Sequence, residues 1–320
     1  MGEAPVPAEP RRRTPRLLRN LWNPLLVKEL RGRMRGARAF VVLSIYLLML
    51  CCFTSFIYYA YTASMSGPSS GSSMAYLGKV VFSSVVVIEI FMVTFLTPAF
   101  TAGAISGEKE RQTYELLRTT LLPARKVVLG KFYSALTYML LLILAAVPLE
   151  SLAFVLGGVE LGELVLALVI LLVAAVFFAA VGLFFSSLMR STLAATILSY
   201  VVALLGTIGL PVLLLFFGTM ILSAVFATSS SPSWMGQVVT IYSTVLLSSF
   251  SPISTAVVTE VFLLDNDAFF YFWQDISYTS APWHRVPVPS PWMIYVLIYL
   301  FLALLMLLIA VLRVRRQAIQ

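Results

Sequence analysis

The sequence predicts an all-α integral membrane protein with six transmembrane helices, an amphipathic helix before the first span, and outward-facing half-helices before the last span. Three observations support this fold class. The 320 residues are 60% hydrophobic and 11% charged, with a mean hydropathy of +0.95, whereas soluble domains are about 25% charged. The apolar residues form runs long enough to cross a bilayer, which takes about 20 residues. The basic residues fall in alternate gaps between these runs.

The distribution of basic residues also predicts the orientation. Of the 22 Lys and Arg residues, all but Lys79 and Arg285 lie before residue 39, between residues 105 and 132, at Arg190, or after residue 312. Short loops rich in Lys and Arg stay on the cytoplasmic side of a membrane. We therefore expect a multi-pass protein of the cell membrane with both termini in the cytoplasm. The net charge of +8 then faces anionic lipid headgroups, and no nucleic-acid partner is expected.

The chain begins with two predicted cytoplasmic segments. Residues 1–19 form a basic, proline-containing tail that we expect to be disordered. Residues 20–38 predict a helix that lies in the headgroup plane, with Asn23 as its cap and Pro24 in its first turn. Its apolar side chains recur every four residues and its charged side chains occupy the other side. These residues are Trp22, Leu26, Leu30 and Met34 on the apolar face, with Lys28 and Glu29 among the charged ones. A generic basic anchor is the alternative interpretation.

The membrane domain is predicted over residues 39–312, followed by a basic cytoplasmic tail at 313–320. Five spans are plain: Ala39–Ala60, Val80–Ile105, Phe132–Leu152, Leu164–Leu188 and Pro291–Leu312. A sixth, Leu193–Phe226, is long for one span and contains three glycines and Pro211. Because proline removes a backbone hydrogen bond, we expect that span to be bent or tilted.

An outward-facing segment is predicted at residues 228–290. Within it, Gln237–Leu264 is apolar enough for a seventh span, but it is rich in Ser and Thr and is broken at Ser251–Pro252. A seventh crossing would also place the C-terminal arginines outside, against the charge rule. We therefore expect two half-helices there, with Asp265–Pro291 as an interfacial cap.

Several kinds of chemistry are excluded by the residues present. The only cysteines, Cys51 and Cys52, are adjacent in the first span, which predicts two small buried side chains rather than a disulfide framework or a metal site. A single histidine, His284, excludes a His-based metal cluster. The Gly78–Lys79 and Gly130–Lys131 pairs lack the rest of the G-x-x-x-x-G-K-(S/T) phosphate loop. We expect no catalytic residue, no metal and no bound cofactor on this chain.

The largest predicted cytoplasmic loop, residues 106–131, carries organised charges. Glu108, Arg111, Glu115 and Arg118 are three or four residues apart, a spacing that lets opposite charges pair along one face of a helix. Such a short charged helix between two spans is suited to contact a soluble partner. A solvated loop helix with no partner is the alternative.

Two segments resemble the permease subunits of ABC-2 type ABC transporters. They are NPLLVKELRGRMRG before the first span, and ISGEKERQTYELLRTTLLPARKVVLGK between the second and third. In that family an amphipathic elbow helix precedes the first span, and glutamates followed by paired leucines mark a coupling helix. The matching positions here are Glu108, Glu110, Glu115, Leu116, Leu117 and Thr119, with Lys131 before the third span. The resemblance extends over most of the chain, from about Asn23 to Arg316.

The resemblance implies a permease that does no ATP chemistry itself. ATP and Mg would bind to a separate ABC ATPase, present in two copies, and a second permease chain, identical or paralogous, would complete the membrane unit. Glu108, Glu110, Arg111, Glu115 and Arg118 would contact the ATPase, and the elbow residues would lie against membrane lipids. Export is favoured over import. The alternatives are a non-transporting sensor or assembly factor on the same scaffold, a transporter driven by an ion gradient, and an intramembrane enzyme.

Two glutamates lie within the apolar runs. Glu89 is about a third of the way along the second span, where a carboxyl group usually marks function. It is a candidate for the translocation path, with a hydrogen bond to a neighbouring helix as the alternative. Glu150, beside Pro148 near the end of the third span, is expected at the wet outer interface.

Overall fold

Six helices in the described part of the chain are long and apolar enough to cross a membrane. The computed structural model describes residues 29, 32, 37–64, 73–112, 123–213, 216–218, 220, 234–266, 269–276 and 284–317. The predicted fold class, an all-α membrane protein with six spans, is confirmed. The spanning helices are α3 (Ala37–Ser64), α4 (Ser73–Thr101), α7 (Ala124–Val155), α8 (Leu161–Leu188), α9 (Thr192–Leu204, continuing as a π-helix) and α13 (Pro291–Gln317).

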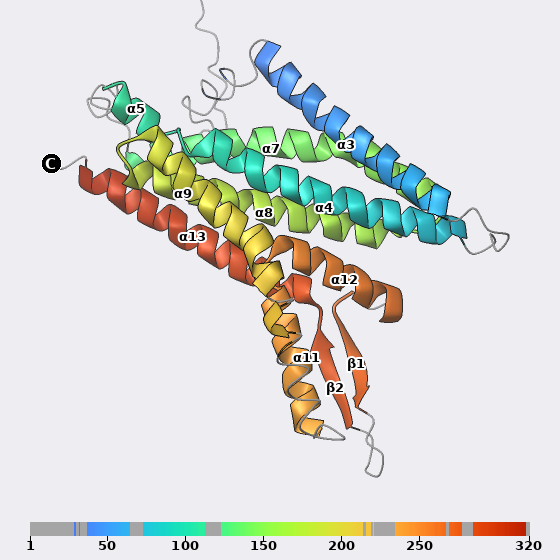
Figure 1. The fold of residues 1–320 in the computed structure, drawn as a ribbon. Coiled ribbons are helices and arrows are strands. Elements are labelled where there is room, and N and C mark those ends of the chain that lie inside the picture. Colours follow the sequence, from blue (N-terminus) through green and yellow to red (C-terminus); the bar gives the residue numbers. More distant parts are fainter. Residues whose placement is uncertain are drawn as a thin grey trace, which may run out of the picture.

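Successive spans run in opposite directions, so the molecule has two chemically different ends (Figure 1). The end of α4, the short helix α5 (Ser106–Glu110), the start of α7, the α8–α9 turn and the end of α13 lie together at one end. We call this the basic end, because it carries Lys109, Arg111, Lys131, Arg190 and Arg313. The other end carries a β-hairpin, and we call it the hairpin end.

Helix α8 is at the centre of the bundle and packs against α4, α7, α9, α12 and α13. Small residues allow this close packing: Ala174, Ala175, Ala179 and Ala180 are fully buried. A Cβ atom on Gly182 would lie 1.9 Å from Oγ1 of Thr101 on α4. Only a glycine therefore fits at this crossing of α4 and α8.

The sixth predicted span is irregular where the sequence suggested a bend. Helix α9 continues into a π-helix, η1 (Leu205–Gly209), directly before Pro211. The proline ring cannot donate an N–H and conflicts with the carbonyl four residues earlier, so a widened turn relieves the conflict. The Thr207 carbonyl accepts a 3.4 Å hydrogen bond from Oγ of Ser251.

The predicted pair of half-helices is confirmed as α11 (Trp234–Ser248) and α12 (Pro252–Asn266). Neither is long enough to be a spanning helix. Their junction is bonded to α13 at two points. Oγ of Ser249 donates to the Pro291 carbonyl at 3.0 Å, and the Tyr299 hydroxyl donates to the Phe250 carbonyl at 2.9 Å.

The cap before α13 contains an antiparallel hairpin that the sequence analysis did not predict. Strands β1 (Tyr271–Ile276) and β2 (His284–Pro289) pair with Phe272 opposite Val288. These two side chains are buried against Val245 of α11, which gives the hairpin one apolar face.

Helix α3 lies at the edge of the bundle (Figure 1). Among its described side chains, only Tyr46 and Leu50 are buried. Cys51 and Cys52 are free and exposed, so the prediction that they are buried is wrong. The reason is that α3 contacts the bundle along one narrow stripe and these residues face away from it.

Candidate functional site

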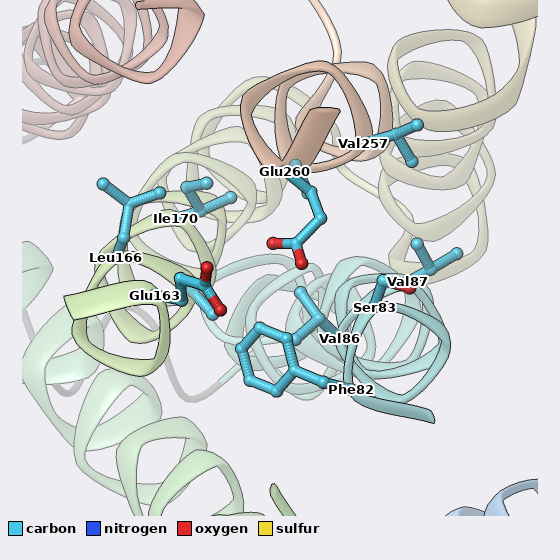
Figure 2. Close-up of a pocket in the computed structure, with 11 residues that line it drawn as sticks. Phe82, Ser83, Val86, Val87, Glu163, Leu166, Ile170, Val257 and Glu260 are labelled. Atoms are coloured by element: carbon cyan, nitrogen blue, oxygen red, sulfur yellow. The ribbon is translucent and has the colours of Figure 1, made fainter. Parts of the chain in front are cut away.

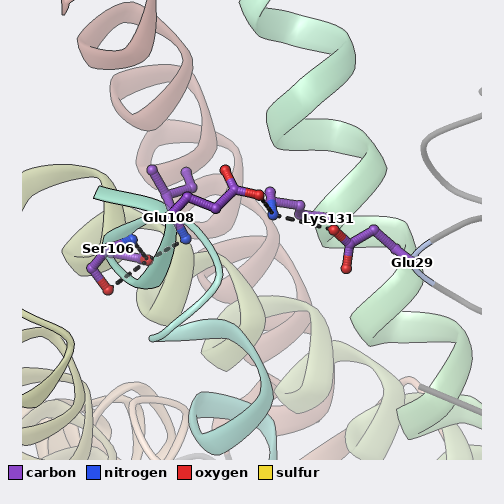
Figure 3. A network of polar contacts seen from close by, with 6 residues as sticks. Glu29, Ser106, Glu108 and Lys131 are labelled. Atoms are coloured by element: carbon purple, nitrogen blue, oxygen red, sulfur yellow. Dashed lines mark hydrogen bonds and ion pairs between the residues drawn. The ribbon is translucent and has the colours of Figure 1, made fainter. Parts of the chain in front are cut away.

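The most connected polar cluster among the described residues lies at the basic end, around Lys131 of α7. This lysine side chain is only 4% exposed. Its Nζ lies 2.7 Å from Oε1 of Glu108 on α5 and 3.3 Å from Oε1 of Glu29, before the first span. Figure 3 shows the ammonium between the two carboxylates. Burying an unpaired ammonium is costly, so the two carboxylates determine where Lys131 can lie.

The start of α5 is held by a side chain from α8. Oγ of Ser186 accepts hydrogen bonds from the backbone N–H groups of Ile105 at 2.8 Å and Ser106 at 3.0 Å (Figure 3). The first N–H groups of a helix have no partner within it, and Ile105 has no side-chain cap to offer. Ser186 supplies the missing acceptor from another span, and both serines are fully buried.

The side chain of Lys109 joins α5 to the end of α8. Its Nζ donates to the Ser187 carbonyl at 2.6 Å and to the Met189 carbonyl at 3.4 Å. The last carbonyls of a helix lack partners and carry partial negative charge, so a cation there is favourable.

The carboxylate of Glu110 caps α9. Its Oε1 accepts the backbone N–H of Thr192 at 2.7 Å, and its Oε2 accepts the Thr192 hydroxyl. The preceding residue, Ser191, makes no capping hydrogen bond of its own. Glu110 thus supplies both an acceptor and a negative charge to the start of α9.

Helix α5 ends sooner than the spacing of charges suggested. Gln112 has a φ of 58°, which a continuing α-helix does not have, and the last residue of α5 is Glu110. Of the residues expected on one helical face, Glu108 lies in α5 and Arg111 in the turn after it, and Glu115 lies outside the described residues. Arg111 is exposed at the turn.

Three of the predicted coupling residues lie in the described part of the chain. Glu108 faces inward to Lys131, Glu110 caps a neighbouring helix, and Arg111 is exposed. Two coupling residues lie outside the described residues, as do all the elbow residues except Glu29: Glu115, Arg118, Trp22, Leu26, Lys28, Leu30 and Met34. The roles of Ser186 and Thr192 were not predicted, because the local sequence does not mark which hydroxyl contacts a distant loop.

Both intramembrane glutamates are buried. Glu89 is 0% exposed and accepts a 2.9 Å hydrogen bond from the Tyr46 hydroxyl of α3. It therefore faces a neighbouring helix in this conformation. Glu150 is 1% exposed, so the prediction that it lies at a wet interface is wrong. The reason is that α7 continues to Val155, which places Glu150 inside the packed helix.

A small cavity lies at the hairpin end between α4, α8 and α12. It measures about 30 Å³, the space of roughly one water molecule. Glu163 of α8 and Glu260 of α12 both line it (Figure 2). Glu163 is paired with Lys79 at 3.4 Å, whereas Oε1 of Glu260 is buried without a hydrogen-bond partner. Burial, together with the charge of Glu163, raises the pKa of Glu260 to about 7.

Comparison with protein families identifies the chain. The family of ABC-2 family transporter proteins matches residues 24–318, from the segment before α3 to the end of α13. The chain belongs to the ABC-2 transporter family. Curated proteins gave no match.

Membership of the ABC-2 family assigns the role of a permease subunit of an ABC transporter. The family domain is the transmembrane component and not a nucleotide-binding domain. It implies association with an ABC ATPase. Helix α5, which is bonded to α7, α8 and α9, lies between the second and third spans of this ABC-2 permease, in the loop where a coupling helix was predicted.

Proposed function

We propose that this permease exports its substrate by coupling to ATP hydrolysis on separate ABC ATPase subunits. The working unit contains two permease chains and two ATPase copies, with ATP and Mg bound only by the ATPases. The basic end is cytoplasmic, because the Lys and Arg residues of the loops gather there, and short loops rich in these residues stay on the cytoplasmic side. The elbow segment lies against lipid on the same side.

The observation that carries this proposal is the attachment of α5 to three spans at once. Glu108 is ion-paired with α7, Lys109 is bonded to the end of α8, and Glu110 is bonded to the start of α9. A displacement of α5 therefore acts on all three spans together. Since bonded and close-packed elements move as units rather than deforming continuously, a partner pressing on α5 has a direct route to the bundle.

The contact surface for the ATPase begins at the exposed turn after α5. Arg111 presents its charge there, and Glu115 and Arg118 follow in the sequence. Glu108 and Glu110 act from behind this surface, since both carboxylates are engaged within the permease. Glu29 joins the elbow segment to the same cluster through Lys131, so the elbow and α5 respond together.

The test is recovery of the ATPase with tagged permease purified from its native membrane. A permease with Arg111→Glu and Glu115→Lys reverses two charges at the contact surface and leaves the Lys131 cluster intact. We expect the wild-type chain to retain its ATPase. The amount of ATPase recovered with the variant should be lower by about tenfold or more, which corresponds to about 1.4 kcal/mol of binding free energy.

The matched control is Arg285→Glu, a charge reversal at an exposed position of β2 at the hairpin end. It should leave ATPase recovery unchanged. Undiminished recovery in the contact-surface variant, with normal elution of the permease on size exclusion, would refute the assigned surface. Absence of any ATPase from the wild-type preparation would refute the coupling itself.

A further inference from the structure

Two exposed arginines lie at the basic end, away from the ion pairs of Lys131. Arg190 is in the turn between α8 and α9, and Arg313 is near the end of α13. Figure 1 shows this turn and the end of α13 at the same end of the bundle as α5. Neither arginine forms an ion pair with a carboxylate of the described residues. The contacts that hold α5 therefore leave both guanidinium groups without a role.

The register of α8 against α13 brings the two arginines to the same level. Both helices run from the hairpin end to the basic end, and the ring centroids of Phe177 and Tyr299 are 4.5 Å apart. Arg190 follows Phe177 by about as many residues as Arg313 follows Tyr299, so similar rises along the two helices place them at similar depths. Val314 is buried in the core, so this end of α13 still packs on the bundle.

The side chain of Lys109 adds a third cation beside the turn. Its Nζ donates to the carbonyls of Ser187 and Met189, and Met189 directly precedes Arg190. Both arginine charges act on this ammonium group, which agrees with the placement from the helix register. Because Lys109 already occupies the open carbonyls at the end of α8, that helix end does not need the arginines as well.

The carboxylate that caps α9 does not neutralise these cations. Glu110 reaches the start of α9, but its two oxygens accept the backbone N–H and the hydroxyl of Thr192. The turn therefore carries an excess of positive charge, at the depth where a spanning helix leaves the hydrocarbon layer. Such an excess attracts an anion from outside the described residues.

An exposed apolar face of α9 begins beside the same turn. Leu193, Ile197 and Val201 are 71%, 52% and 46% exposed. They are four residues apart and so share one face of the helix, which runs from the basic end into the membrane. A ligand that matches both features is an anion with an apolar chain. Free phosphate matches only the arginines.

We propose that Arg190 and Arg313 bind the phosphate of one anionic phospholipid, whose acyl chain lies along Leu193, Ile197 and Val201. A guanidinium group donates two parallel hydrogen bonds to phosphate oxygens, and basic sites between spans bind lipid headgroups. The bound lipid links the α8–α9 turn to α13. This site rests on the spans crossing a bilayer and not on the proposed coupling to an ATPase.

The experiment is native mass spectrometry of the full-length permease in detergent, titrated with phosphatidylglycerol or with phosphatidylcholine of the same acyl chains. We expect the wild-type protein to bind one phosphatidylglycerol more tightly than any phosphatidylcholine. The Arg190→Gln, Arg313→Gln double variant should bind that lipid about tenfold more weakly or worse. Glycerol phosphate, which has the headgroup charge without acyl chains, should not displace the lipid.

The matched control loses the same charge elsewhere. Arg285→Gln with Arg315→Gln also removes two arginines, one on β2 and one that points away from Arg313, because two residues turn a helix by about 200°. It should keep the wild-type affinity, and monodisperse elution on size exclusion verifies that both double variants fold.

Three results would overturn the proposal. The first is equal weakening in the two double variants, which would mean a general attraction to charge. The second is displacement of the lipid by glycerol phosphate. The third is unchanged lipid affinity together with reduced ATPase recovery in the Arg190→Gln, Arg313→Gln variant, which would assign the two arginines to a protein partner.

Discussion

Lys131 illustrates how a single residue joins distant parts of the chain. It is a cation at the start of a spanning helix, 4% exposed, and its two partners come from the segment before α3 and from α5. Removing one partner of a buried ion pair is more costly than removing the pair, because the remaining charge is left without compensation.

We predict that Lys131→Met lowers the stability of the permease by about 2 kcal/mol, since Glu108 and Glu29 then face each other without a cation. The measurement is the apparent Tm of the purified protein in detergent. Adding Glu108→Gln to Lys131→Met should recover part of the loss, because it removes the charge of one of the two carboxylates that Lys131 contacted. An unchanged Tm in Lys131→Met would show that the ion pairs do not stabilise the fold.

At the residue scale, the sequence indicated which side chains are organised but not which partners they contact or how deeply they are buried. The charge pattern singled out Glu108 and the family resemblance added Glu110, but their partners in the structure, Lys131 and Thr192, are set by packing between spans. The burial of Glu150 was not predicted, since apolar residues on both sides of it leave the end of the helix undefined. Exposure of a side chain depends on neighbours that the local sequence does not specify.

The spanning elements were the most predictable features. Five of the predicted spans match α3, α4, α7, α8 and α13 with differences at their ends, because the cost of exposing backbone to lipid forces a long apolar run into a helix. The half-helices were recognised from the Ser251–Pro252 break. The hairpin was not, since Pro287 and Pro289 argue against a strand; a two-stranded sheet tolerates them at its edges.

The crossing of α4 and α8 gives the sharpest prediction at the element scale. Gly182→Ala places a methyl group 1.9 Å from Oγ1 of Thr101, so the two helices must separate or Thr101 must lose its position. We expect a destabilisation of about 1–3 kcal/mol, seen as a lower apparent Tm and a smaller monodisperse fraction.

A matched glycine provides the control for that substitution. At Gly206, the nearest atom to an added Cβ is Cζ of Phe178 at 3.9 Å, an ordinary contact. Gly206→Ala should therefore leave the apparent Tm close to that of the wild type. Equal effects of the two substitutions would mean that the close approach of α4 and α8 does not determine stability.

At the scale of the whole molecule, the alternation of spans predicts which surface each end faces. In a background with Cys51 and Cys52 replaced by serine, Arg285→Cys places a thiol at the hairpin end and Arg190→Cys places one at the basic end, both at exposed positions. A membrane-impermeant maleimide should label Arg285→Cys in intact cells and Arg190→Cys only after permeabilisation. The reverse pattern would invert the orientation.

The bonds between the half-helix junction and α13 have a mechanical consequence. α13 is an unbroken helix of 27 residues, about 40 Å long, and Ser249 and Tyr299 fasten the junction to its first turns. A helix resists compression along its axis far more than its neighbours resist sliding. α13 therefore acts as a strut of fixed length, so that a shift of Arg315 and Arg316 on one side of the membrane moves the half-helices on the other.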